Sequence, residues 1–264
     1  MDIRETLLRF KRGEIDLEET VRNIRLTGLE KLGMDVLFDL GRKDRRDVPE
    51  IVLAEGKRPD TLLKIVSEVA KRSGCVVVSR LAVDQLNALL DGLSGADLEV
   101  EVNEIGKVAV VSTRGFTREK LQCKVGIVTA GTADVPVAEE ASTIVEVMGC
   151  QVVKAYDRGV AGLKRAIDAA ILMKREDVDV ALVVAGMEGA LGSVMASLLD
   201  VPVIGVPSSV GYGAGGRGEA ALLSMLQACP LGLAVVNIDN GVNAAVVASM
   251  IGRRVALART LRTP

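Results

Sequence analysis

The 264-residue sequence contains no histidine and no tryptophan. Without histidine the chain cannot build Ser–His or Cys–His pairs, and it lacks both the most common general base and the usual imidazole ligands of zinc and iron. Any catalysis must therefore use carboxylates, lysine, tyrosine, a thiol or backbone dipoles. Aromatic residues make up only 2% of the chain, so aliphatic side chains must form the core. This composition suits parallel strands packed closely under helices.

An excess of one charge and long apolar runs are also absent. The formal net charge of −2 gives no electrostatic reason to expect nucleic acid or an anionic membrane as a partner. No apolar run approaches the roughly 20 residues that span a bilayer. The charged N-terminus is typical of an amphipathic helix and not of a signal peptide. We therefore expect a soluble, cytoplasmic protein.

The four cysteines are widely spaced and form no CxxC pair: Cys75, Cys123, Cys150 and Cys229. This spacing argues against a disulfide framework or a zinc site. The first three each stand at the start of a predicted strand, where a small buried hydrophobe is the better interpretation. Cys229 lies between a helical pattern and a strand-like run, and it fits either a core residue or a nucleophile.

Two patterns divide the chain, and we predict a small α/β domain over 1–118 and a second domain over 119–264. The first begins with two amphipathic helical stretches, the second of which carries Val21, Ile24, Leu29 and Leu32. A basic segment at 41–50 and short strands follow. The second domain alternates apolar strands with amphipathic helices, which indicates βαβ units and a three-layer parallel sheet of the flavodoxin or Rossmann type. Ligands of such sheets bind at the carboxyl ends of the strands.

The turn after the first strand of the second domain reads TAGTADVP, residues 129–136. Gly131 allows a tight turn, while Thr132 and the amides that open the next helix could hold a phosphate. An ordinary turn in which Asp134 caps the helix is the alternative. Alone, this motif is weak evidence for a nucleotide site.

The next two strand ends carry charged side chains. After the second strand, Arg158 could bind a phosphate or carboxylate, or it could pair with Asp157 at the surface. After the third strand, Glu188 is a lone carboxylate among glycine, alanine and methionine residues. It could favour the dipole of the following helix, but we prefer a role in proton transfer.

The last two strand ends are rich in glycine and in amide side chains. The loop at 210–218, VGYGAGGRG, could approach a ligand closely or move as a lid, and a merely flexible loop is the alternative. Turn chemistry explains some of the polar residues in NIDNGVN. It does not readily explain Asn237, which is expected to interrupt a strand.

These turns, taken in order, resemble the core of PurE-type phosphoribosylaminoimidazole carboxylases over roughly residues 124–252. AGTAD is similar to that family's phosphate turn, and AGMEGALGSVMASLLDVPVIGVP to its CO₂-handling loop and following strand. The carboxylases use a histidine in the loop and another after the second strand, whereas this chain has Ala190 and Asp157 near those positions. The purine-pathway reaction is therefore the alternative and not the first choice.

A larger set of motifs resembles the LarB family over most of the chain: PEIVLAEGKRP, VTAGTADVPVAEEA, AYDRGVAGLKR, AGMEGALGSVMASL and CPLGLAVVNIDNG. The resemblance implies a nickel-pincer nucleotide cofactor biosynthesis enzyme with a PurE-like domain, active as a homo-octamer. Such enzymes carboxylate the pyridinium ring of nicotinic acid adenine dinucleotide and split its phosphoanhydride, which gives pyridinium-3,5-biscarboxylic acid mononucleotide and AMP. By resemblance, Cys229 matches the covalent cysteine and Glu188 the essential carboxylate.

The residue chemistry is compatible with this assignment. A thiolate that adds at C4 of the electron-poor ring makes C5 nucleophilic toward CO₂, and loss of the C5 proton with expulsion of the thiolate restores aromaticity. Magnesium could assist at the phosphoanhydride, and no organic cofactor is expected. The predicted substrate-binding residues are those of the strand-end turns: Thr129, Gly131, Thr132, Asp134, Tyr156, Asp157, Arg158, Gly186, Met187, Ser208, Ser209, Asn237, Asp239 and Asn240.

The main alternatives are a phosphoribosylaminoimidazole carboxylase or mutase and a non-catalytic nucleotide-binding protein. The role of the first domain stays open. Its most site-like segment is LAEGKRP with Glu55, Lys57 and Arg58, which fits an adenylate pocket or a solvated basic turn equally.

Overall fold

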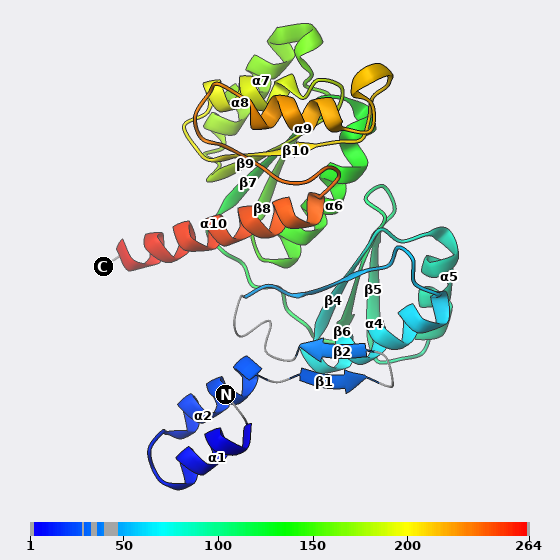
Figure 1. The fold of residues 1–264 in the computed structure, drawn as a ribbon, viewed down its shortest axis with the longest axis vertical. Coiled ribbons are helices and arrows are strands. Elements are labelled where there is room, and N and C mark those ends of the chain that lie inside the picture. The colour runs from blue at the N-terminus through cyan, green and yellow to red at the C-terminus, as the bar shows by residue number, and fades with distance from the viewer. Residues whose placement is uncertain (1–2, 28, 33–35, 40–46, 263–264) are drawn as a thin grey trace. The chain divides into compact units, whose positions relative to one another are not determined.

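The computed structural model describes residues 3–27, 29–32, 36–39 and 47–262 (Figure 1). Contacts divide the chain into two compact units. The first comprises Met1–Val102 and Ala109–Phe116, and the second comprises Asn103–Val108 and Thr117–Pro264. Residues 41–46 of the expected basic segment lie outside the described residues.

The first unit begins with helices α1 (Ile3–Lys11) and α2 (Leu17–Thr27). Strands β1 (Leu29–Leu32) and β2 (Val36–Asp39) follow and pair antiparallel. The prediction that Leu29 and Leu32 continue the second helix is therefore wrong. The sequence has glycine at position 28, and glycine disfavours a helix interior by about 1 kcal/mol relative to alanine.

A four-stranded sheet in the order β3-β4-β6-β5 forms the rest of the first unit. Its strands are β3 (Glu50–Leu53), β4 (Cys75–Ser79), β5 (Leu98–Asn103) and β6 (Val108–Thr113), with helices α4 (Pro59–Ser73) and α5 (Val83–Leu93). The predicted helix start at Pro59 is confirmed, because Pro occupies the first turn of α4, where its missing N–H costs nothing. The predicted strands of the first domain do not include β5, although Leu98, Val100 and Val102 alternate with polar residues and pack on the core.

The second unit is built on a five-stranded sheet in the order β11-β10-β9-β7-β8, with every neighbouring pair parallel. The strands are β7 (Lys124–Thr129), β8 (Gln151–Ala155), β9 (Val180–Ala185), β10 (Val203–Pro207) and β11 (Leu233–Val235). The helices are α6 (Val135–Val147), α7 (Leu163–Arg175), α8 (Ala190–Leu198), α9 (Glu219–Leu226) and α10 (Gly241–Arg262). Helices α6 and α10 cover one face, and α7, α8 and α9 cover the other (Figure 1). The predicted three-layer α/β fold is confirmed.

The central strand β9 is buried along its whole length, as expected for a parallel strand covered on both faces. On the α7–α9 side, Met173, Leu191, Met195 and Met225 fill the space between helices and sheet. At about 25 cal/mol per Å² of apolar surface removed from water, this core is the main stabilising contribution to the second unit.

Helix α10 is the one described helix that is long and apolar enough to cross a membrane, over Gly241–Leu261. Four of its alanines, Ala244, Ala245, Ala248 and Ala256, are buried, and the helix packs against α6, β9 and β10. Arg253 of the same helix pairs with Glu119 at 2.7 Å. These contacts explain its apolar composition by packing on the sheet.

Candidate active site

The five parallel strands end at a common carboxyl edge, and Asp134 lies at the centre of the polar contacts there. Its carboxylate accepts hydrogen bonds from the Ser208 hydroxyl at 2.5 Å and from the Gly131 amide at 2.8 Å. The Gly186 amide also lies close enough to this carboxylate to lower its pKa. Asp134 and Ser208 are buried. One side chain thus links the turns that follow β7, β9 and β10.

Burial raises the pKa of the Asp134 carboxyl, although the hydrogen bonds from Ser208, Gly131 and Gly186 oppose the shift. The carboxylate of Asp239 lies near enough to add to the rise. A carboxyl with a raised pKa beside two other strand ends is a common feature of functional sites. Asp134 makes no side-chain cap bond to α6, so the alternative of a simple helix cap does not describe it.

Thr129 joins the ends of β7 and β8. It is fully buried, its hydroxyl accepts from the Asp157 amide at 3.0 Å, and its carbonyl accepts from the Arg158 amide at 2.8 Å. Asp157 has a left-handed φ of 57° and pairs with Arg165 at 3.2 Å. The Arg158 Nε is buried and has no hydrogen-bond partner among the described residues. The structure therefore does not contain the alternative ion pair between Arg158 and Asp157.

Tyr156 takes part in a different set of contacts, which we call the Glu139 cluster: Glu139, Lys154, Tyr156 and Asn103. The Tyr156 hydroxyl donates to Glu139 Oε1 at 2.7 Å, Lys154 Nζ donates to both carboxylate oxygens at 2.9 and 3.0 Å, and Asn103 donates at 2.9 Å. Burial opposes ionisation of Glu139, but these hydrogen bonds outweigh it and lower its pKa. The pKa of Tyr156 is raised by burial and by the Glu139 carboxylate. Tyr156 is thus a structural partner of Glu139. A carboxylate within an otherwise apolar helix is the sequence feature that could have predicted this cluster.

Glu188 lies in the tight turn between β9 and α8. The Met187 amide donates to the Val210 carbonyl at 2.8 Å, and Met187 and Gly189 both have left-handed φ values, of 51° and 66°. A β-carbon on Gly186 would clash with the Val210 carbonyl, so only glycine allows the loop after β10 to approach this closely. Glu188 itself is exposed. The apolar surroundings expected for its side chain are absent in the single chain.

The turn after β11 contacts the turn after β10. The Ser209 amide donates to Asp239 Oδ1 at 2.8 Å, and the Asp239 amide donates to the Pro207 carbonyl at 2.9 Å. Asn240 Oδ1 accepts from the Asn243 amide and so opens α10. The expectation that Asn237 interrupts a strand is wrong, because β11 ends at Val235 and Asn237 accepts from the Ile238 amide in a turn.

Thr132 is exposed on the short 3-10 helix η1 (Thr132–Asp134), as the predicted phosphate turn requires. The glycine loop contains a second short turn, η3 (Gly213–Gly215), and its Tyr212 is 81% exposed. Both segments extend from the carboxyl edge into solvent, so they are accessible to a ligand bound there.

Cys229 lies near the amino edge of the sheet, opposite the strand-end turns. Helix α9 follows the loop after β10, and Cys229 lies in the chain between the end of α9 at Leu226 and the start of β11 at Leu233. Leu233 opens β11 beside Val203, the first residue of β10, so Cys229 precedes the amino edge. It is exposed and unbonded to the other cysteines. A single chain therefore does not bring Cys229 and Glu188 together.

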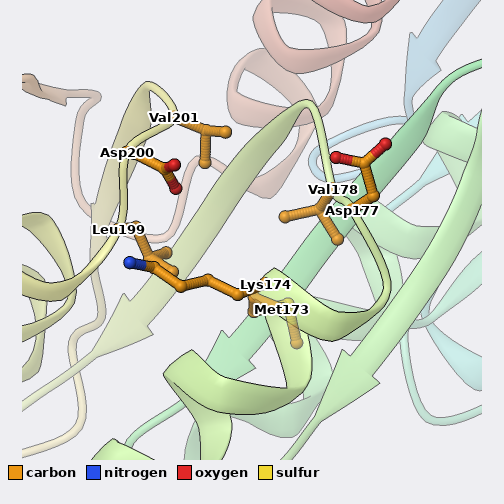
Figure 2. A pocket seen from close by; sticks show the side chains of 7 residues that line it. All are labelled: Met173, Lys174, Asp177, Val178, Leu199, Asp200 and Val201. Carbon is orange, nitrogen blue, oxygen red and sulfur yellow. The ribbon is translucent and has the colours of Figure 1, made fainter.

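A cavity of about 150 Å³ opens at the amino edge, between α7 and the loops before β9 and β10 (Figure 2). Its charged lining residues are Lys174, Asp177 and Asp200. It contains none of the predicted site residues, so it is not the strand-end site.

No group of three or more His, Cys, Asp or Glu side chains that could hold a metal ion occurs among the described residues.

In the first unit, Glu55 pairs with Arg80 at 3.3 Å and Arg58 with Asp60 at 3.2 Å, both at the surface. Lys57 donates to the Leu53 carbonyl. These local pairs favour the solvated-turn interpretation of LAEGKRP.

Family models match both parts of the chain. The model described as AIR carboxylase matches residues 124–260, and the model described as LarB/PurE-like N-terminal domain matches residues 29–113. The chain belongs to the LarB/PurE-like family. Its AIR carboxylase domain coincides with the five-stranded parallel sheet and its helices, and the predicted family is confirmed.

Two kinds of relatives are similar to this chain, one over nearly its whole length and one over its second half. An uncharacterized protein of Methanocaldococcus jannaschii is 39% identical over 253 residues, which cover 96% of this chain and 97% of the relative. An N5-carboxyaminoimidazole ribonucleotide mutase of Pyrococcus horikoshii is 35% identical over 133 residues, 48% of this chain and 71% of the mutase. A mutase of the same name from M. jannaschii is 33% identical over 124 residues, 46% of this chain and 74% of the mutase.

Proposed function

We propose that the protein carboxylates C5 of the pyridinium ring of nicotinic acid adenine dinucleotide and hydrolyses its phosphoanhydride, giving pyridinium-3,5-biscarboxylic acid mononucleotide and AMP. The observation that carries this proposal is the LarB/PurE-like N-terminal domain joined to an AIR carboxylase domain without any histidine. A carboxylase without imidazole needs another way to generate a carbon nucleophile, and a thiolate that adds reversibly to an electron-poor ring supplies one.

The carboxyl edge would hold the dinucleotide. Arg158 supplies a guanidinium whose Nε is buried and unpartnered, which suits a phosphate oxygen. The exposed Thr132 and the backbone amides of its turn add uncharged donors. Asp239 supplies a carboxylate suited to a ribose hydroxyl, while the buried Asp134 holds the strand-end turns in place. Magnesium would enter bound to the diphosphate, because the described residues offer no cluster of three ligands for it.

The ring chemistry requires Cys229 and Glu188 at adjacent carbons of the same pyridinium ring. The Cys229 sulfur would add to C4, C5 would attack CO₂, and Glu188 would remove the C5 proton as the C–S bond breaks. Strand β10 has five residues, and at about 3.3 Å per residue it separates the two edges of the sheet by roughly 16 Å. Because a side chain does not cover that distance, we propose that Cys229 of one copy serves the carboxyl edge of another in a homo-oligomer, an octamer by family resemblance.

A single incubation tests the activity. The protein is mixed with nicotinic acid adenine dinucleotide, magnesium and ¹³C-bicarbonate. The products are then separated and identified by mass spectrometry. The proposal predicts AMP and a mononucleotide that carries one labelled carboxyl group. Binding of the dinucleotide without either product would refute it.

The similarity to N5-carboxyaminoimidazole ribonucleotide mutases favours one alternative, an isomerisation of a carboxylated aminoimidazole ribonucleotide. Ala190 and Asp157 stand near the positions of that family's histidines. The same incubation with N5-carboxyaminoimidazole ribonucleotide separates the alternatives, since only the mutase would convert it.

A further inference from the structure

Two cysteines predicted to be small buried residues are indeed buried, and they lie opposite each other at the amino edge of the parallel sheet. Cys123 directly precedes β7, and Cys150 directly precedes β8. Lys124 is the register partner of Gln151, so the cysteines one residue earlier face each other across neighbouring strands. The Gln151 amide donates to the Cys123 carbonyl at 3.0 Å, which holds the two segments together at this point.

The two sulfur atoms converge beneath α10. A β-carbon on Gly252 would lie 3.1 Å from Cys123 Sγ and 3.2 Å from Cys150 Sγ, so both thiols reach the same point on the helix. The two thiols interact closely enough to shift each other's pKa in opposite directions. Paired strands lie about 4.8 Å apart, within the Cα separation of about 4.4–6.8 Å that disulfides bridge.

The Cys150 thiol, together with two nearby guanidinium groups, favours ionisation of the Cys123 thiol. The hydrogen bond from Cys150 lowers the pKa of the Cys123 thiol, burial and the Asp179 carboxylate oppose the shift, and the guanidinium groups of Arg259 and Arg253 support it. The same hydrogen bond and burial raise the pKa of Cys150. A thiolate in contact with a thiol is the pair of groups from which a disulfide forms.

We propose that Cys123 and Cys150 are a redox-active dithiol that a peroxide closes to a disulfide. The Cys123 thiolate attacks one oxygen of hydrogen peroxide and breaks the O–O bond, which gives a sulfenic acid and hydroxide. The sulfur of Cys150 then attacks the sulfenic sulfur. The S–S bond forms, the S–O bond breaks, and the departing hydroxide takes the thiol proton as water. Two thiols and one peroxide become a disulfide and two waters once the hydroxide is neutralised.

The oxidant has to be small because the two cysteines are only 2% and 4% exposed. The disulfide would tie the start of β7 to the start of β8 and close a loop that contains the 129–136 turn and α6. A cross-link of this kind restricts the unfolded chain, so the oxidised protein should unfold at a higher temperature. The pair lies at the edge opposite the strand-end turns, and the proposal is independent of the dinucleotide reaction.

Peptide mapping of the full chain tests the proposal, because trypsin separates the cysteines. Cys123 falls in Leu121–Lys124 and Cys150 in Val125–Lys154, while Cys75 and Cys229 fall in other peptides. The folded protein is treated with hydrogen peroxide, denatured with an alkylating reagent and digested without reductant. We expect the two peptides to be linked with the loss of two hydrogen atoms, and the link to disappear on reduction. The unfolding temperature should rise with peroxide and fall back with reductant.

Single substitutions supply the controls. Cys123→Ala and Cys150→Ala should each lose the linked peptides and the temperature shift, whereas Cys75→Ala should keep both. Recovery of Cys123 and Cys150 as alkylated thiols after peroxide treatment of the wild-type protein would overturn the proposal, as would separate oxidation of each to a sulfinic acid. This result is read from the wild-type protein, so it stands even where a variant does not fold.

Discussion

Removing the hydroxyl of Tyr156 measures what the Glu139 cluster contributes to the stability of the second unit. Tyr156→Phe deletes the 2.7 Å hydrogen bond to Glu139 and keeps the ring. A hydrogen bond to a charged group contributes about 1.5–3 kcal/mol. Lys154 and Asn103 remain as donors to the same carboxylate, so we expect the lower end, a loss of about 1.5 kcal/mol in the free energy of unfolding.

Urea unfolding followed by circular dichroism measures this loss, with the transition of each unit fitted separately. Tyr212→Phe is the matched control, since it makes the same chemical change on a side chain that is 81% exposed. The control should change the free energy of unfolding by less than about 0.5 kcal/mol.

A double-mutant cycle with Glu139→Gln tests the cause of the loss. The effect of Tyr156→Phe should shrink in the Glu139→Gln background, because the charged acceptor is then gone. An equal loss in Tyr156→Phe and Tyr212→Phe, or an undiminished loss in the Glu139→Gln background, would refute the assignment of this hydrogen bond.

Three further predictions concern pH, backbone packing and the phosphate site. The lowered pKa of Glu139 stabilises the fold above the unfolded pKa of about 4.3, and this contribution disappears as pH falls through the folded pKa. When urea unfolding is measured from about pH 7 to pH 3, the free energy of unfolding should therefore fall less steeply with pH in Glu139→Gln than in the wild-type protein. An equally steep fall would contradict the assignment of this pH dependence to Glu139. Gly186→Ala should cost more than about 1 kcal/mol by clashing with the Val210 carbonyl, whereas Gly211→Ala, with no neighbour closer than 3.6 Å, should cost little. Arg158→Met should weaken dinucleotide binding at least about tenfold by calorimetry with little loss of stability, while Arg165→Met should not; equal affinities would remove Arg158 from the phosphate site.

The alternation of apolar strands and amphipathic helices after residue 124 predicts the parallel sheet of the second unit, because each strand there is a short apolar run with a clear boundary. The first unit was harder to predict. The helical periodicity of Val21 and Ile24 extends by chance to Leu29 and Leu32, which form a strand. The strand over Leu98–Asn103 has three alternating apolar residues, too short a pattern to stand out from the flanking loop.

The candidate site was predictable at the strand ends and not beyond them. Since parallel strands end at one edge, the turns at Asp134, Gly186 and Ser208 had to meet, and hydrogen bonds join them. The position of Cys229 was also available from chain order, because a residue before a parallel strand lies at the amino edge. Chain order does not predict which surfaces of two copies meet in an oligomer.

A mixing experiment tests most directly whether Cys229 and Glu188 act together across two copies. Cys229→Ser and Glu188→Gln are each expected to form no labelled mononucleotide from nicotinic acid adenine dinucleotide and ¹³C-bicarbonate. After the two variants are unfolded, combined in equal amounts and refolded together, about a quarter of the sites should regain both wild-type side chains by random assembly. The account predicts that labelled product and AMP reappear in the mixture and in neither variant alone. A mixture that stays inactive, while wild-type protein refolded in the same way is active, would contradict it.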